Sequence, residues 1–412
     1  MLALCSGRPL DAQAVVGGTT NTFRQFAGQV FKVQVVETGS AAKAGIGSGF
    51  LVSADGRMIT NFHVISNVVN TPARYRAELI DSAGKSTPVK VLAVDIVHDL
   101  AVLQTELRNR PFFRIEAVAV SQGDRLFSLG NPEDLGLSIV EGTYNGLLSH
   151  TLYPRIHLTA SINPGMSGGP TIDGQGHVIG VNVATGGDQL GFLVPVDQVS
   201  KILGAAPSGK TLPIAPSPAE LGKQLERYQD NYLKGMFDAS TRTIEFGPYR
   251  VPTQPAPFFR CWGDRFNPRE RTYGGSYHQC ETDEYIYLGD DQITGTLQLR
   301  HELLTSRELN APRFFKLYND LYKRDNSPVG EVEFVTNWKC QTRNVRNNGL
   351  TMQVAQCLRR YKTIGALYDS YVKVAALGRS NVGLISTMTV TGVTFEHATK
   401  VTERYLSLIS WR

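Results

Sequence analysis

Ser167 lies in the most informative segment of this 412-residue chain, Asn163–Pro170, which reads Asn-Pro-Gly-Met-Ser-Gly-Gly-Pro. A serine hydroxyl that projects from a sharp turn can attack a carbonyl carbon. The backbone N–H groups of Gly165 and Ser167 would then point into one small space and stabilise the oxyanion that forms. Glycines on both sides of the serine permit such a turn. The segment predicts acyl-transfer chemistry, with a plain glycine-rich turn as the alternative.

A serine nucleophile needs a base, and an acid that orients the base, and two upstream segments offer them. Residues 47–65 predict a hairpin whose two strands are joined by a two-residue Asp55-Gly56 turn. His63 stands at the far end of the second predicted strand, and Asp99 stands just before an apolar run. Each of these residues alone has a structural explanation. Their order along the chain, His then Asp then Ser, favours a catalytic set.

These segments together resemble the HtrA-type branch of the trypsin-like, chymotrypsin-fold serine proteases. The resemblance covers about residues 25–203, or half of the chain. The segments that carry it are Gly47–Phe50, Thr60–Val64, Asp99–Leu103, Leu129–Pro132, Asn163–Pro170, Gly180–Asn182 and Gly191–Val196.

The resemblance implies a role for each catalytic residue. His63 is then the general base, Asp99 orients its imidazole, and Ser167 forms an acyl-enzyme without a metal or an organic cofactor. Gly165 and Ser167 supply the oxyanion hole. Met166 stands where relatives usually have asparagine, and we expect it to face away from the scissile bond as an apolar plug.

The substrate pocket is only partly readable. The resemblance implies that the floor of the primary pocket lies six residues before the nucleophile, where Ser161 offers no acid to attract lysine or arginine. The facing residues Val181, Asn182 and Val183 are small and mostly apolar. This lining predicts a preference for a small or medium aliphatic residue before the cut, because well-placed methylene groups contribute about 1–3 kcal/mol each.

Length and composition predict a mostly β protein with at least two cores, since 42% of the residues are hydrophobic and only 19% are charged. The expected fold is a chymotrypsin-like double β-barrel followed by a disulfide-bearing α+β domain. We assign residues 1–20 to a leader or signal remnant, 21–204 to the protease domain, 205–218 to a linker and 219–412 to the second domain. No run of 18 apolar residues occurs, so no membrane span is expected.

Four cysteines lie in the second domain, which shows neither the carboxylate-binding loop nor the strand order of the PDZ domain that HtrA relatives carry. Asn348-Gly349 predicts a type I′ hairpin turn. In the resulting register Cys340 lies directly opposite Cys357, which is compatible with a disulfide. Cys261 and Cys280 then pair by elimination. A zinc site is the alternative, but the gaps between the cysteines exceed the usual ligand spacing.

The rest of the second domain predicts an amphipathic docking helix over 219–236 and suggests an internal duplication. Each cysteine pair is followed by a Thr-rich apolar strand and then an amphipathic helix. The two predicted strands are Ile293–Leu299 and Leu384–Val390, and the two helices are Pro312–Tyr322 and Phe395–Ile409.

Charge differs between the two halves. Residues 1–204 carry 15 Lys and Arg against 16 Asp and Glu, whereas residues 205–412 carry 27 against 21. Two disulfides indicate an oxidising compartment, so we expect an exported, periplasmic or secreted protein. An anionic envelope surface is the partner that this basic half suggests, and nucleic acid is not expected.

The sequence therefore predicts a serine endopeptidase that acts on proteins or peptides. Two alternatives remain at this stage. One is a catalytically degenerate protein that only binds polypeptides. The other is an envelope-binding module to which a protease is attached.

Overall fold

The computed structural model of the chain describes residues 18–185, 187–207, 216–233, 236–237, 241–266, 272–290, 292–324, 327 and 333–412. Most of the predicted leader, and residues 208–215 of the predicted linker, lie outside these ranges. By contacts the chain divides into two units. The first comprises Met1–Ala93, Leu100–Leu147 and Arg155–Pro213, and the second comprises Val94–Asp99, Leu148–Pro154 and Ile214–Arg412.

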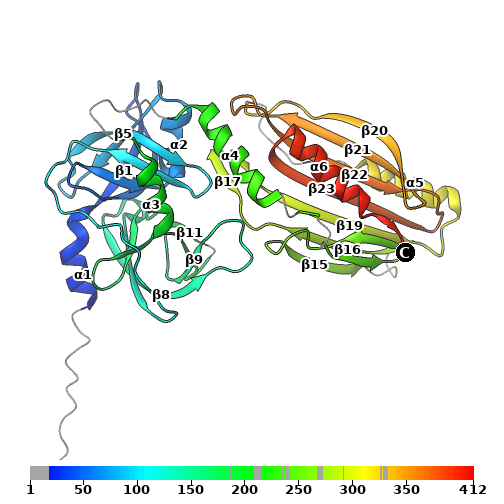
Figure 1. The fold of residues 1–412 in the computed structure, drawn as a ribbon, viewed down its shortest axis with the longest axis horizontal. Coiled ribbons are helices and arrows are strands. Elements are labelled where there is room, and N and C mark those ends of the chain that lie inside the picture. Colours follow the sequence, from blue (N-terminus) through cyan, green and yellow to red (C-terminus); the bar gives the residue numbers. More distant parts are fainter. Residues whose placement is uncertain are drawn as a thin grey trace, which may run out of the picture. The chain divides into compact units, whose positions relative to one another are not determined.

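The first unit contains two closed six-stranded barrels (Figure 1). In the first barrel the strands follow the order β1-β2-β3-β6-β5-β4, and in the second the order β10-β11-β12-β9-β8-β7. The first barrel is built from β1 (Val30–Glu37), β2 (Lys43–Leu51), β3 (Arg57–Thr60), β4 (Tyr75–Ile80), β5 (Ser86–Asp95) and β6 (Leu100–Gln104). The second is built from β7 (Arg125–Gly130), β8 (Ser138–Leu147), β9 (Ile156–Thr159), β10 (Pro170–Ile172), β11 (Val178–Thr185) and β12 (Gly191–Pro195).

Short helices accompany the barrels, and one apolar cluster joins them. The cluster includes Phe50 and Val102 of the first barrel, Leu129 and Val194 of the second, and Val199 of helix α3. The helical elements are α1 (Gly18–Phe26), η1 (Ala27–Gln29), α2 (Phe62–Asn70), η2 (Pro132–Asp134) and α3 (Val196–Ala205). The predicted double β-barrel is confirmed.

The second unit is built on a seven-stranded sheet with the order β15-β16-β19-β23-β22-β21-β20. Two small sheets, β13-β14-β24 and β17-β18, accompany it. The large sheet consists of β15 (Arg260–Phe266), β16 (Gly274–Glu281), β19 (Leu297–Thr305), β20 (Lys339–Asn347), β21 (Leu350–Arg360), β22 (Leu367–Ala376) and β23 (Val382–Thr394). The remaining elements are α4 (Pro218–Tyr232), β13 (Thr243–Phe246), β14 (Tyr249–Pro252), β17 (Ile286–Gly289), β18 (Gln292–Thr294), α5 (Ala311–Lys323), α6 (Phe395–Ser407) and β24 (Ser410–Trp411).

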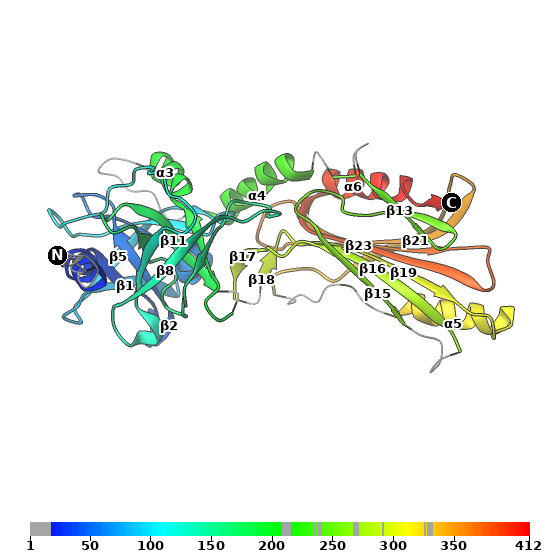
Figure 2. The same ribbon diagram turned by 90° about the horizontal axis from the view of Figure 1, so that it is seen from below.

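Helices α5 and α6 cover opposite faces of this sheet (Figure 2). Side chains alternate between the faces of a strand. Leu384 belongs to the cluster that packs on Tyr405 of α6, whereas its neighbour Ile385 belongs to the cluster of Phe314 on α5. The central strand β23 is therefore covered on both faces, whereas the edge strands β15 and β20 are mostly exposed.

Both predicted disulfides are present, and they join strands at the two edges of the sheet. Cys261 of β15 is bonded to Cys280 of β16, and Cys340 of β20 is bonded to Cys357 of β21. Each pair is directly opposite in the strand register. The structure therefore has both cysteine pairs as disulfides rather than as free thiols.

Two local predictions differ from the structure. The hairpin of residues 47–65 is present, but Leu51 pairs with Met58, so its loop is longer than an Asp55-Gly56 turn allows. The Ser53 hydroxyl oxygen accepts the N–H of Arg57 and closes the longer loop. The first of the two predicted Thr-rich strands is displaced, because β19 runs over Leu297–Thr305.

The predicted amphipathic helix is confirmed as α4. It begins at a capping box, in which the side chains of Ser217 and Glu220 each bind the other residue's backbone N–H. Its buried face includes Leu221 and Leu225. Among the described residues, no helix is long and apolar enough to cross a membrane.

Candidate active site

Ser167 lies in a tight turn that leads into β10. The N–H of Met166 donates to the carbonyl of Asn163 at 3.0 Å, and Gly165 has a φ of 92°. A Cβ at Gly165 would come within 2.4 Å of the Asn131 carbonyl oxygen. Only glycine fits this position without strain. The turn that the sequence predicts therefore requires its glycine for two separate reasons.

The turn holds the Gly165 N–H in a defined direction. The carbonyl of Pro164 accepts the N–H of Glu133 at 2.9 Å. In a trans peptide the C=O group and the following N–H group point in opposite directions. The Gly165 N–H consequently points away from Glu133. This is a fixed peptide orientation, as an oxyanion hole requires.

Asp134 anchors the loop whose Glu133 N–H binds the Pro164 carbonyl. Its carboxylate oxygens lie 2.6 Å from the Nζ atoms of Lys32 and Lys43, which belong to the first barrel. Hydrogen bonds from the two lysines lower the pKa of Asp134 to about 2. Glu133 and Asp134 both have positive φ angles, of 47° and 62°, which non-glycine residues rarely adopt. The two lysines therefore hold a strained loop against the nucleophile turn.

Ser48 of β2 joins the turn to the first barrel. Its hydroxyl donates to the carbonyl of Gly165 at 2.7 Å and accepts the N–H of Asn131 at 2.8 Å. Its own backbone N–H donates to the carbonyl of Ser167 at 2.7 Å. One residue of the Gly-Ser-Gly-Phe segment thus binds both ends of the Gly165–Ser167 segment.

His63 lies in the first turn of α2, not at the end of a strand as the sequence predicted. Strand β3 ends at Thr60, and buried Asn61 is the N-cap of the helix. Asp99 directly precedes β6, whose Ala101 pairs with Thr60. Because β3 and β6 are antiparallel, the chain leaves β3 at the same end at which it enters β6.

The segments that carry His63 and Ser167 meet at Gly47. A Cβ on Gly47 would lie 2.5 Å from the Val64 side chain, next to His63, and 3.1 Å from the carbonyl oxygen of Ser167. A Cβ on Gly168 would lie 2.1 Å from the carbonyl oxygen of Ser48. Three chain segments therefore pack here without room for a methyl group.

The predicted pocket residues differ in their exposure. The Ser167 hydroxyl donates to the carbonyl of Val183 at 3.4 Å, so Val183 lies beside the nucleophile. Ser161 is exposed. Val181 is fully buried in the core shared by the barrels, and Asn182 is fully buried too. Val183 is buried as well, so Ser161 alone of the four predicted residues is exposed.

The side chain of Asn182 supports the nucleophile turn through hydrogen bonds. Its amide nitrogen donates to the carbonyls of Leu129 and Met166, at 3.2 and 3.3 Å, and its amide oxygen accepts from Thr171 at 2.6 Å. Met166 is fully buried in the core of the second barrel. The prediction that Met166 acts as an apolar plug is confirmed.

Sequence reasoning missed the roles of Ser48, Asn182 and Asp134. Ser48 and Asn182 lie inside segments that it quoted, so their positions were marked but their contacts were not. Asp134 carried no signal, because Lys32 and Lys43 lie far from it in the sequence. Contacts between such distant residues follow no local spacing rule.

Two closed six-stranded barrels and a Gly-x-Ser-Gly-Gly turn between them define the class of chymotrypsin-like proteins. The family model of the trypsin-like peptidase domain matches residues 47–181. A putative serine protease of Synechocystis, HhoB, is 32% identical over 213 residues, which are 48% of this chain and 48% of that protein. A probable periplasmic DegP-like serine endoprotease of Chlamydia pneumoniae is 33% identical over 38% of this chain and 33% of its own length.

Among solved structures, that of Deg5 is 28% identical, with a TM-score of 0.39, and covers 47% of this chain and 95% of that one. The chain spans about half the length of the first curated relatives that it matches. The matched part of this chain is therefore similar in sequence to HtrA-type trypsin-like serine proteases.

Proposed function

We propose that this protein is a serine endopeptidase that hydrolyses peptide bonds of proteins through Ser167, His63 and Asp99. The observation that carries the proposal is the orientation of the Gly165 peptide, with the Pro164 carbonyl bonded to the Glu133 N–H. Such preorganised donors stabilise the tetrahedral intermediate. A turn kept only for structure has no need to hold this N–H group in one fixed direction.

In this mechanism His63 takes the proton of the Ser167 hydroxyl as oxygen attacks the scissile carbonyl, and later gives it to the leaving amine. The N–H groups of Gly165 and Ser167 bind the oxyanion. Asp99 holds the imidazole in one tautomer. Water then hydrolyses the acyl-serine. The domain's similarity to named serine proteases supports these assignments.

A fluorophosphonate probe and an unfolded protein substrate test the proposal together. We expect covalent labelling of Ser167, and a fall in hydrolysis of at least about 10⁴-fold in Ser167→Ala. Ser121→Ala, which changes an exposed serine of the same unit, is the control. A folded wild-type protein that binds the polypeptide but neither reacts with the probe nor cleaves would support the binding-only alternative.

For specificity, we propose that small or medium aliphatic residues are preferred before the cut. Ser161 and the neighbourhood of Val183 provide no charge that would favour a basic residue. A peptide series that varies only this position is the test, with valine, alanine and leucine against lysine and aspartate. A preference for lysine of about tenfold or more would contradict the assignment.

For localisation, we propose export to an oxidising compartment and contact with an anionic envelope surface. The two disulfides support export, and so does the similarity to the probable periplasmic endoprotease of Chlamydia pneumoniae. A hollow of about 610 Å³ in the second unit, between α4 and α6, is lined by four cationic side chains and three acidic ones. The cationic residues are Lys223, Arg227, Lys400 and Arg404.

Cosedimentation of the full chain with anionic vesicles would test this contact. Binding should weaken steeply with salt, and it should weaken further in Lys223→Gln/Lys400→Gln. Equal binding to neutral vesicles would contradict the proposed charge attraction.

A further inference from the structure

The disulfide Cys261–Cys280 is asymmetric in its exposure. Cys261 lies on β15, an edge strand of the large sheet, and is exposed. Cys280 lies on the inner strand β16 and is fully buried. An external thiolate can therefore approach the sulfur of Cys261 but not that of Cys280. Attack on Cys261 would expel Cys280 as the leaving group.

The buried sulfur is surrounded by polar groups that can stabilise a negative charge. The N–H of Gln254 donates to Sγ of Cys280 at 3.4 Å. Nε2 of His278 lies 3.4 Å from the same sulfur, and the Thr253 hydroxyl lies 3.8 Å from it. Neutral disulfide sulfur is a weak acceptor, whereas a thiolate accepts hydrogen bonds strongly. These groups match the thiolate better than the disulfide.

The backbone beside the sulfur is strained. Gln254 has a φ of 44°, in the left-handed region that non-glycine residues rarely adopt. The N–H of this residue is the group that donates to Sγ of Cys280. Residues held in such conformations cluster at functional sites. The strain is therefore a second observation, independent of the cysteine pair itself.

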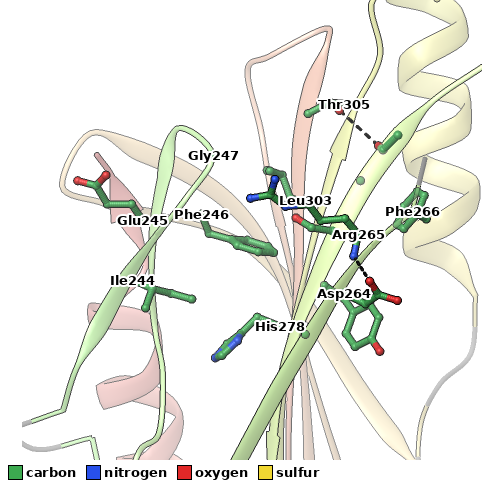
Figure 3. Close-up of a pocket in the computed structure, with 15 residues that line it drawn as sticks. Ile244, Glu245, Phe246, Gly247, Asp264, Arg265, Phe266, His278, Leu303 and Thr305 are labelled. Carbon is green, nitrogen blue, oxygen red and sulfur yellow. Dashed lines mark hydrogen bonds between the residues drawn. The ribbon is translucent and has the colours of Figure 1, made fainter. Parts of the chain in front are cut away.

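His278 connects the sulfur to an open cavity of about 960 Å³ between the β13–β14 hairpin and the large sheet (Figure 3). Its ring lies at one end of this cavity, opposite Phe246. The Thr253 hydroxyl lies 2.6 Å from Nε2. Partial burial lowers the pKa of His278, so its imidazole is neutral at neutral pH and can accept a proton.

The second disulfide provides a comparison within the molecule. Cys340 is exposed on the opposite edge strand, and Cys357 is buried beside it. Within the part of the chain that the structure describes, no hydrogen bond to either of these sulfurs is seen. The two disulfides share strand geometry and exposure but differ in the polar groups around the buried sulfur.

We propose that Cys261 is a thiol-exchange site, at which a low-molecular-weight thiol forms a mixed disulfide while Cys280 leaves as a buried thiolate. The thiol sulfur bonds to Sγ of Cys261, the Cys261–Cys280 bond breaks, and its electron pair stays on Sγ of Cys280. The proton of the attacking thiol passes to solvent or to His278. The strand pairing keeps the two sulfurs together, so return attack by Cys280 expels the thiol and restores the bridge.

The experiment exposes the folded full chain to reduced glutathione at about pH 7.5, followed by alkylation and peptide mass spectrometry. We expect a glutathione adduct on Cys261 and an alkylated Cys280. This exchange should be about tenfold or more faster than any reaction at Cys340–Cys357. Thr253→Val and His278→Gln should each slow it, with Tyr287→Phe as an unrelated control in the same unit.

Two results would overturn the proposal. One is an equal exchange rate at the two disulfides of the wild-type protein. The other is an adduct on Cys280 instead of Cys261. Both are measured on the unaltered chain, so neither result depends on whether a variant folds. Proteolytic activity does not enter either measurement.

Discussion

Asp134 shows how one side chain outside the nucleophile turn can fix the geometry of that turn. Its contacts with Lys32 and Lys43 hold the loop whose Glu133 N–H binds the Pro164 carbonyl. We predict that Asp134→Asn lowers kcat about tenfold and changes KM less than twofold. Loss of a whole oxyanion donor costs about 10²–10³, and a misdirected donor should cost part of that. Kinetics on one peptide substrate separate the two constants.

Glu141→Gln is the matched control for this positioning residue, because it removes an exposed ion pair of the same 2.6 Å length from the second barrel. Because the pKa of Asp134 is lowered to about 2, its carboxylate is almost fully ionised above about pH 4. The stabilising contact is therefore present above about pH 4 and is lost only as pH falls toward 2. The ratio of wild-type to variant kcat should stay constant from pH 5 to 9. Equal losses in both variants would refute the positioning role.

The roles of residues near the nucleophile could be predicted from the sequence where a short motif is tied to one function. Ser167 with its glycines is one case, and the burial of Met166 is another. Partners were not readable, because Asp134 meets lysines about a hundred residues away. The sequence predicted Asn182 as a pocket residue, whereas its side-chain amide makes three hydrogen bonds inside the protein.

At the scale of elements, the two hairpin turns show when a local signal suffices. Asn348 and Gly349 both have positive φ, as a type I′ turn requires, and the register brings Cys340 opposite Cys357. The Asp55-Gly56 pair does not form the predicted two-residue turn, because the Ser53 hydroxyl oxygen accepts the Arg57 N–H and closes a longer loop. A turn signal sets register only where no neighbouring side chain competes.

Removal of the Cys340–Cys357 bridge should destabilise the second unit without changing its register. The double variant Cys340→Ala/Cys357→Ala should lower the free energy of unfolding by about 3 kcal/mol, the cost for a closed loop of this size. Urea unfolding under oxidising conditions measures it, with Gln341→Ala, an exposed neighbour on β20, as the control. A loss below about 0.5 kcal/mol would mean that the bridge does not limit stability.

His301 makes the second unit sensitive to acid, because it joins four elements from inside the core. The carbonyl of Pro252 can only accept, so Nε2 carries the proton and donates to it at 2.8 Å. Nδ1 then accepts from the Ser386 hydroxyl at 2.6 Å, and Tyr405 of α6 bonds to that hydroxyl in turn. Burial lowers the pKa of His301 to about 3, and the stacked ring of His278 further disfavours its charge.

Between pH 6.5 and 3 the unfolded chain therefore binds a proton at His301 that the folded chain does not. Stability is complete above about pH 6.5 and falls as pH decreases. We predict that urea midpoints measured at about pH 7.5 and 4.5 differ less in His301→Phe than in wild type. The free energy of unfolding should fall by about 1.4 kcal/mol more per pH unit in wild type than in His301→Phe, and exposed His150→Gln should behave as wild type. Parallel pH curves for wild type and His301→Phe would exclude His301 as the source.

For the molecule as a whole, sequence predicted the order of the parts but not the membership of two short segments. Val94–Asp99 and Leu148–Pro154 belong by contacts to the second unit, although the sequence places both within the protease half. In this unit the hydroxyl of Tyr153 donates to the carbonyl of Tyr285 at 2.7 Å. No local periodicity encodes such a pairing, because its energy comes from residues more than a hundred positions apart.

The side-chain amide of Gln224, on α4, binds backbone groups of the segment Val94–Asp99. Its amide nitrogen donates to the carbonyl of Val94 at 2.8 Å, and its amide oxygen accepts the N–H of Ile96 at 3.1 Å. Asp99 ends the same segment. A leucine at this position has similar volume but leaves both backbone groups without these bonds. The segment, and with it the backbone of Asp99, should become less well positioned.

We therefore predict that Gln224→Leu lowers kcat severalfold and shifts the acid limb of the kcat/KM profile to lower pH. The shift is expected because, in the proposed mechanism, the Asp99 carboxylate favours the protonated form of the His63 imidazole, and a displaced carboxylate favours it less. Asn231→Ala, exposed on the same helix, should leave both quantities unchanged. If Gln224→Leu loses stability but keeps the wild-type pH profile, the segment is only a packing element. A shifted profile at wild-type stability would instead make the second unit part of the machinery that positions Asp99.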